Sequence, residues 1–67
     1  MNIWDFQYEY QHNIKLKDID GNVYIGRLLD IMDVDEMDTE EARVTLENKN
    51  GIISFSESEI VSMEVIE

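Results

Sequence analysis

The chain has 67 residues, with sixteen acidic residues, five basic residues and no cysteine, and its formal charge is −11. This length predicts a single domain, residues 1–67. The absence of cysteine excludes a disulfide and a cysteine-based zinc site. The charge disfavours nucleic acids and anionic membranes as partners, because both are bound mainly through Lys and Arg. No apolar run is long enough to span a membrane, so we expect a cytoplasmic protein.

Residues 1–12 form an aromatic N-terminal segment that has two competing interpretations. Polar residues separate a row of apolar side chains at even positions, interrupted only by His12: Trp4, Phe6, Tyr8, Tyr10, Ile14 and Leu16. A period of two is typical of a strand with one buried face. The alternative is a helix over residues 2–12 with Asn2 as its N-cap. Residues 13–18 are predicted as strand under either interpretation.

Three glycines organise the rest of the predicted sheet. Asp20-Gly21-Asn22 and Asn50-Gly51 are typical of hairpin turns, because these residue types tolerate positive φ angles. The strand predicted over residues 23–34 contains Gly26, which indicates a bulge or a bend where another backbone comes close. The remaining predicted strands cover residues 43–47, 52–55 and 60–66.

Five predicted strands without proline indicate a mainly β fold, a small, strongly bent antiparallel barrel. In the last strand, Val61, Met63 and Val65 are expected to share one face. Proline and inward lysines are missing from the last two strands, so nothing there blocks strand addition, and we expect a homo-oligomer. The expected interface residues are Ile52, Ile53, Phe55, Ile60, Val61, Met63 and Val65.

Two residue patterns suggest a family. The hydrophobic strand Ile14-Lys15-Leu16-Lys17 is followed by Gly21, then by Gly26 and the pair Leu28-Leu29. A second pattern runs over residues 55–61, where an apolar residue, a polar corner and an aliphatic strand follow one another. Over roughly residues 13–66 the chain therefore resembles the Sm-like (LSm) family. The resemblance implies an optional short N-terminal helix, a five-stranded Sm-like or SH3-like barrel, and rings in which the fourth strand of one subunit pairs with the fifth strand of the next.

The residues with which this family binds RNA do not occur at the matching positions. Residues 33–37 lack the family's Asn and its stacking ring, and Ser56 and Glu57 replace its Arg-Gly pair. A carboxylate in place of a guanidinium repels phosphate. The resemblance therefore implies the scaffold with a lost RNA pocket, and the degenerate motif positions are Gly21, Gly26, Asp33, Ser56 and Glu57.

Residues 33–41 hold six carboxylates in nine positions, which predicts a solvated acidic loop. The loop is not an EF-hand, because Met37 and Val44 occupy positions 5 and 12, where calcium ligands are required. Weak, unselective binding of a divalent cation is the alternative to a plain loop.

We expect no enzyme and no cofactor. His12 has neither a nucleophile nor an orienting partner at a recognisable spacing, and a half-buried position at the end of a strand is expected for it. The serines lack a nucleophile elbow, and there is no glycine-rich phosphate loop. Core or intersubunit packing is expected of four aromatic residues, with a partner surface as the alternative: Trp4, Phe6, Tyr8 and Tyr10.

The expected function is a non-catalytic, Sm-like interaction module that self-associates through its edge strands. One alternative is an acidic nucleic-acid mimic that binds a basic protein partner, although its acids are concentrated in one loop. Another alternative is an atypical Sm-like ring that binds RNA. Lys15, Lys17 and Arg27 are expected to form a local salt-bridge cluster and not a nucleic-acid footprint.

Overall fold

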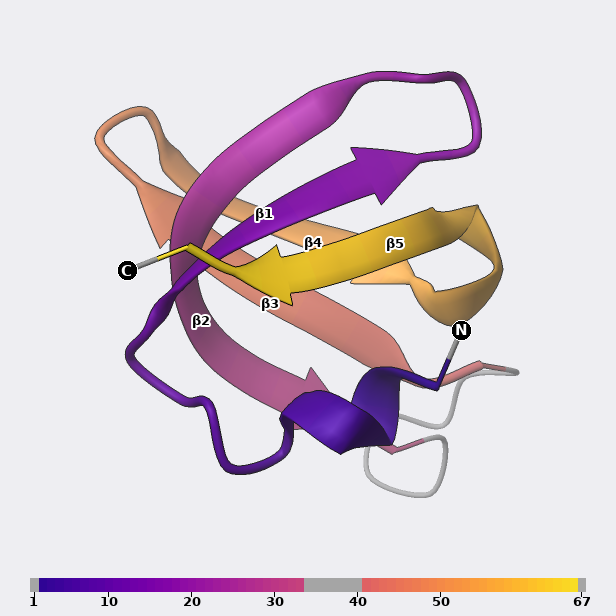
Figure 1. Ribbon diagram of the computed structural model, residues 1–67, viewed down its shortest axis with the longest axis horizontal. Helices are drawn as coiled ribbons and strands as arrows, with labels where there is room; N and C mark the ends of the chain where they lie inside the picture. The colour runs from indigo at the N-terminus through magenta and orange to yellow at the C-terminus, as the bar shows by residue number, and fades with distance from the viewer. Residues whose placement is uncertain (1, 34–40, 67) are drawn as a thin grey trace.

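A computed structural model describes residues 2–33 and 41–66 (Figure 1). These residues form one five-stranded antiparallel sheet and two short 3-10 helices, with no α-helix, which confirms the mainly β prediction. The strands are β1 (Asn13–Asp18), β2 (Val23–Met32), β3 (Arg43–Asn48), β4 (Gly51–Ser56) and β5 (Ile60–Val65). The 3-10 helices are η1 (Ile3–Phe6) and η2 (Glu57–Glu59). The strand order is β4-β3-β2-β1-β5, so β4 and β5 are the two edges of the sheet.

The N-terminal aromatic segment is not a strand, and its helix is shorter than the alternative prediction. The Asn2 side chain accepts a hydrogen bond from the Trp4 N–H at 3.0 Å, as expected of an N-cap, but η1 contains only Ile3–Phe6. Turns follow, and Gln11 has a φ of 74° where the chain enters β1. The residue of this segment that is fully buried is Ile3, which lies outside the predicted stripe. Periodicity failed here because turn hydrogen bonds satisfy the backbone of most of this segment, whereas Gln11 and His12 at its end bond to a neighbouring strand, at Leu28 of β2.

Asp18 closes the predicted β1–β2 hairpin. Its Oδ1 accepts hydrogen bonds from the N–H groups of Asp20, at 3.0 Å, and Asn22, at 2.8 Å, and Gly21 has the positive φ of 86° that the turn requires. Burial of Asp18 acts to raise the pKa of its carboxyl. Hydrogen bonds from Asn22, Asp20 and Tyr24 outweigh burial and lower the pKa below the ordinary value. The ionised carboxylate is therefore part of the folded turn.

Gly26 lies where β2 passes close to β3, as predicted, and Figure 1 shows β2 as a long curved strand. A Cβ atom at Gly26 would lie 2.9 Å from the Glu47 carbonyl oxygen and 3.1 Å from the Leu46 Cβ. The bulge itself falls at Leu29, where the register between β2 and β3 shifts. Strand β2 ends at Met32, and the predicted end at residue 34 lies outside the described residues.

The prediction that Val61, Met63 and Val65 share one face of β5 is wrong for Val61, where the strand contains a bulge. Met63 and Val65 do lie on the same face, opposite Leu16 and Ile14. The register of β5 against β1 shifts by one residue at Val61. Ile60 and Met63 are therefore the buried residues, while Val61 is 50% exposed and Val65 is 37% exposed. A one-residue shift exchanges the two faces of a strand, and alternation in the sequence does not reveal where such a shift occurs.

The hydrophobic core lies on the inward face of the sheet, with η1 and Ala42 packed against it. Its members are Ile3, Ile14, Leu16, Leu28, Ile31, Ala42, Val44, Leu46, Phe55, Ile60 and Met63. Partly buried side chains that pack against this core are Trp4, Phe6, Tyr24 and Ile53. Within the described ranges, no helix is both long enough and apolar enough to cross a membrane.

Candidate functional site

The free edge of β5 presents the backbone groups of two residues. The Ile66 N–H donates to the Asn13 carbonyl at 3.0 Å. Antiparallel partners that exchange hydrogen bonds alternate with partners that do not. The backbone groups of Glu64 therefore point towards β1, whereas those of Met63 and Val65 point towards the free edge. These two residues are positioned to accept an added strand.

The free edge of β4 is shorter than its sequence implies. The Glu57 N–H donates to the Ala42 carbonyl at 3.0 Å, and the same alternation directs the backbone groups of Ile52, Ser54 and Ser56 outward. The Ser56 N–H, however, donates to Glu59 Oε1 at 2.9 Å. Glu59 thus caps one end of this edge, and Ile52 and Ser54 keep both backbone groups directed outward.

Glu41 holds η2 in place by hydrogen bonds, next to the end of β4 that Glu59 caps. Its carboxylate accepts hydrogen bonds from the Ser58 N–H at 2.7 Å and from the Ser58 hydroxyl at 3.0 Å. These hydrogen bonds, together with the Arg43 charge, hold the pKa of Glu41 below its ordinary value although burial acts in the opposite direction. The connection between β4 and β5 is therefore fixed by side chains as well as by backbone.

The structure exposes only part of the predicted interface set. The side chains exposed to solvent are Ile52 (66%), Val61 (50%) and Val65 (37%). Those in or against the core are Ile53, Phe55, Ile60 and Met63. A contact through these edges would thus combine outward backbone groups with the first set of side chains.

The four N-terminal aromatic residues do not form one exposed surface. Trp4 and Phe6 are half-buried and pack against the core, as the packing interpretation expects. Tyr8 is 84% exposed and Tyr10 is 38% exposed. Of the predicted partner surface, the two tyrosines are the members exposed to solvent.

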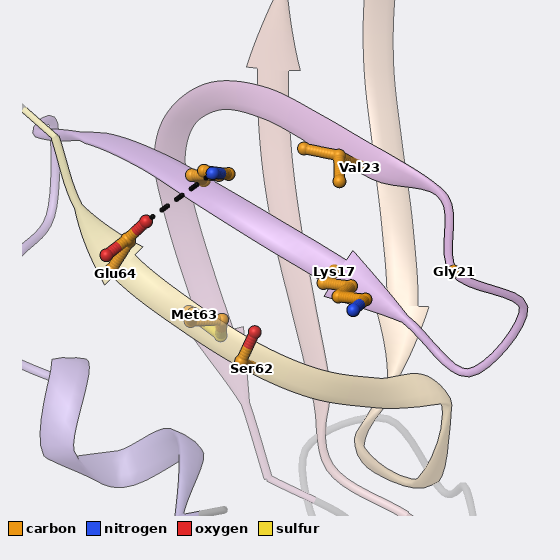
Figure 2. A pocket seen from close by; sticks show the side chains of 7 residues that line it. Lys17, Gly21, Val23, Ser62, Met63 and Glu64 are labelled. Carbon is orange, nitrogen blue, oxygen red and sulfur yellow. Dashed lines mark ion pairs between the residues drawn. The ribbon is translucent and has the colours of Figure 1, made fainter.

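A groove of about 380 Å³ lies on the exposed side of β1, β2 and β5 (Figure 2). It is lined by Lys15, Lys17, Gly21, Val23, Ser62, Met63 and Glu64. The Lys15 Nζ lies 3.8 Å from Glu64 Oε1, the ion pair drawn as a dashed line in Figure 2. Arg27 pairs separately with Glu47 of β3. The predicted cluster of Lys15, Lys17 and Arg27 is therefore not a single cluster, since Lys15 and Arg27 pair with different acidic residues.

Four of the five positions predicted to be degenerate motif positions have structural roles in this chain. Gly21 forms the first turn, Gly26 allows the close approach of β3, and Glu57 begins η2. The Ser56 hydroxyl accepts a hydrogen bond from Arg43 Nη1 at 2.7 Å, and Arg43 Nε donates to the Ser54 hydroxyl at 3.0 Å. Sequence reasoning missed Arg43, although the register set by the second hairpin places it opposite Ser56.

Neither the predicted acidic loop nor His12 contributes to a metal-binding group in the part of the chain that the structure describes. Asp33 is exposed after β2, and residues 34–40 of the predicted acidic loop lie outside the described residues. His12 is exposed, not half-buried, and its Nε2 lies 4.0 Å from Glu9 Oε2. Over residues 2–33 and 41–66, no three His, Cys, Asp or Glu side chains are grouped so as to hold a metal ion.

Comparisons of the chain with protein families, with curated proteins and with solved structures gave no match. The Sm-like resemblance of residues 13–66 therefore stays a prediction.

Proposed function

We propose that this protein is a non-catalytic, Sm-like interaction module that self-associates by pairing β4 of one copy with β5 of the next. The observation that carries the proposal is the pair of open edges. Ile52 and Ser54 on β4, and Met63 and Val65 on β5, direct their backbone groups away from the sheet. Exposed edges of this kind are templates for pairing with another chain.

Two further observations support a bent, Sm-like barrel. The strand order places β4 and β5 at opposite edges, which is the arrangement that head-to-tail pairing between copies requires. The rings of Tyr24 and Phe55 have centroids 4.9 Å apart, and this contact joins β2 to a strand two places away in the sheet. Such a contact favours a curled arrangement over a flat one.

The surroundings of the second motif support the loss of RNA binding. At the position of the family's arginine, the Ser56 N–H is engaged by Glu59 and its hydroxyl accepts from Arg43. The next residue, Glu57, adds a carboxylate. The Glu57 carboxylate repels phosphate, and the nearby Arg43 guanidinium is already hydrogen-bonded to Ser54 and Ser56.

Proline substitutions at the two edges test the proposal. Ser54→Pro and Val65→Pro each remove an outward N–H and leave the backbone hydrogen bonds to β3 and β1 in place, so both variants are expected to fold. Light scattering coupled to size-exclusion chromatography should find the unmodified protein oligomeric in about 0.5 M salt, a concentration that screens the repulsion between its copies. Each proline variant should be monomeric.

Tyr8→Ser is the matched control, because it removes an exposed side chain that belongs to neither edge strand and should leave the oligomer intact. Circular dichroism would verify that each variant is folded. A monomeric unmodified protein at high concentration and high salt would refute self-association, as would an oligomer that survives both proline substitutions.

A further inference from the structure

We infer that β5 is also the docking edge for an extended, basic segment of another protein, which adds to the sheet as an antiparallel strand. The inference rests on the proposed function in one respect only, namely that the edge of β5 is open. It names a different occupant for that edge, and the charges and side chains around β5 determine the chemistry of this occupant.

Charge favours a basic occupant over a second copy of the chain. Every copy carries a formal charge of −11, so two copies repel each other at low ionic strength. The same charge attracts a cationic segment and accelerates its association. On β5 itself, Glu64 is exposed and lies one strand position from the free edge residue Val65.

The side chains of β5 specify an alternating partner. An added antiparallel strand places each of its side chains on the same face as the residue opposite. Its residue opposite Glu64 therefore lies on the exposed face, where a Lys or Arg would share this carboxylate with Lys15. Its residue opposite Val65 lies on the inward face, beside the core, where an apolar side chain fits.

Exposed apolar side chains extend this edge. Val61, the bulged residue of β5, is 50% exposed, and Ile66, which follows β5 on the same face as Glu64, is 44% exposed. Strand addition gains affinity from main-chain hydrogen bonds and specificity from alternate side chains. The expected occupant is thus an amphipathic strand with basic residues on one face and β-branched residues on the other.

The other edge is less suited to such a segment. At β4, Glu59 already occupies the Ser56 N–H, which shortens the edge. The Arg43 guanidinium bonds Ser54 and Ser56 on the same strand and would repel a basic side chain placed beside it. At β5 the cations Lys15 and Lys17 belong to β1, one strand further from the added segment.

Binding of a synthetic peptide tests the inference. The probe is a blocked nine-residue peptide of alternating Lys and Val, and its control has the same composition with the lysines grouped at one end. Fluorescence anisotropy at low salt should show tighter binding of the alternating peptide. Amide shift changes in NMR spectra should centre on Met63–Ile66, and binding should weaken as salt is raised.

The two proline variants separate this inference from self-association. Val65→Pro should weaken binding of the alternating peptide roughly tenfold, the effect of losing one hydrogen bond and the strand geometry around it. Ser54→Pro changes only β4 and should bind the peptide like the unmodified protein, even though it no longer self-associates. Glu64→Gln should also weaken binding, whereas Asp30→Asn removes the same charge from an exposed site on β2 and should not.

Equal binding of the alternating and grouped peptides would overturn the inference, since it would show attraction by charge alone. Unchanged binding by both Val65→Pro and Glu64→Gln would also overturn it. A protein that is monomeric yet binds the alternating peptide at β5 would refute self-association and retain this inference. A protein that oligomerises but does not bind the alternating peptide would support self-association and refute this inference.

Discussion

Asp18 shows how one side chain determines the stability of a turn. Its carboxylate accepts hydrogen bonds from two N–H groups of the β1–β2 connection, and these bonds favour its ionised form over its protonated form. The pKa of Asp18 is consequently lower in the folded chain than in the unfolded chain. A carboxyl group of this kind stabilises the fold above its unfolded pKa of about 3.9 and loses that effect as the pH falls through its folded pKa.

We predict that Asp18→Asn lowers the melting temperature at pH 7 and that the loss diminishes as the pH falls through the lowered pKa of Asp18, where the carboxyl of the unmodified protein also becomes protonated. Thermal unfolding followed by circular dichroism from pH 7 to pH 2 measures this difference. Asp30→Asn is the control, because it removes the same charge from an exposed residue. A destabilisation by Asp18→Asn that is constant over the whole pH range would contradict the prediction.

Single residues also show how far the sequence could predict local structure. Asn2 was recognisable as a cap, because capping needs only a side-chain oxygen and the next N–H groups. Gln11 was not recognisable, since nothing in a glutamine signals a positive φ. The role of Arg43 depends on the serines opposite it on β4, so it emerges only when the strands are paired.

At the level of strands, Gly26 permits the contact between β2 and β3. We predict that Gly26→Ala destabilises the protein by about 1–3 kcal/mol, because a methyl group there would clash with the backbone of Glu47 and the two strands must shift. Urea unfolding measures the loss. Ser62→Ala, at an exposed position of β5, should change the free energy of unfolding little. An unfolding midpoint of Gly26→Ala equal to that of the unmodified protein would disprove the close approach.

The hairpins were predictable and the bulges were not. Asp20-Gly21 and Asn50-Gly51 carry their turn geometry in two adjacent residues, so the strands around them were placed to within a residue or two. The bulge at Val61 arises from the pairing of β5 with β1, two strands far apart in the sequence. The exposure of Val61 follows from that bulge, and so it could not be read from alternation.

For the whole molecule, charge opposes any assembly of identical copies. We predict that self-association tightens as sodium chloride is raised, since the screening length falls from about 10 Å at 0.1 M to about 3 Å at 1 M and the repulsion between copies of charge −11 weakens. Analytical ultracentrifugation across a salt series measures the dissociation constant. Sodium sulfate at equal ionic strength would separate screening from salting-out. Association that weakens steadily with salt would indicate contacts made by opposite charges instead.

The short edges of β4 and β5 also have a kinetic consequence. Each edge has two residues whose backbone groups all point outward, so one contact holds about four backbone hydrogen bonds, each with a net contribution of about 0.5–1.5 kcal/mol. A single junction of this size should dissociate rapidly, because differences in affinity are expressed mainly in the dissociation rate. An assembly that persists would have to close on itself, so that one broken junction re-forms before the subunit departs. The lifetime of such an assembly would then depend on closure more than on the strength of any one strand pair.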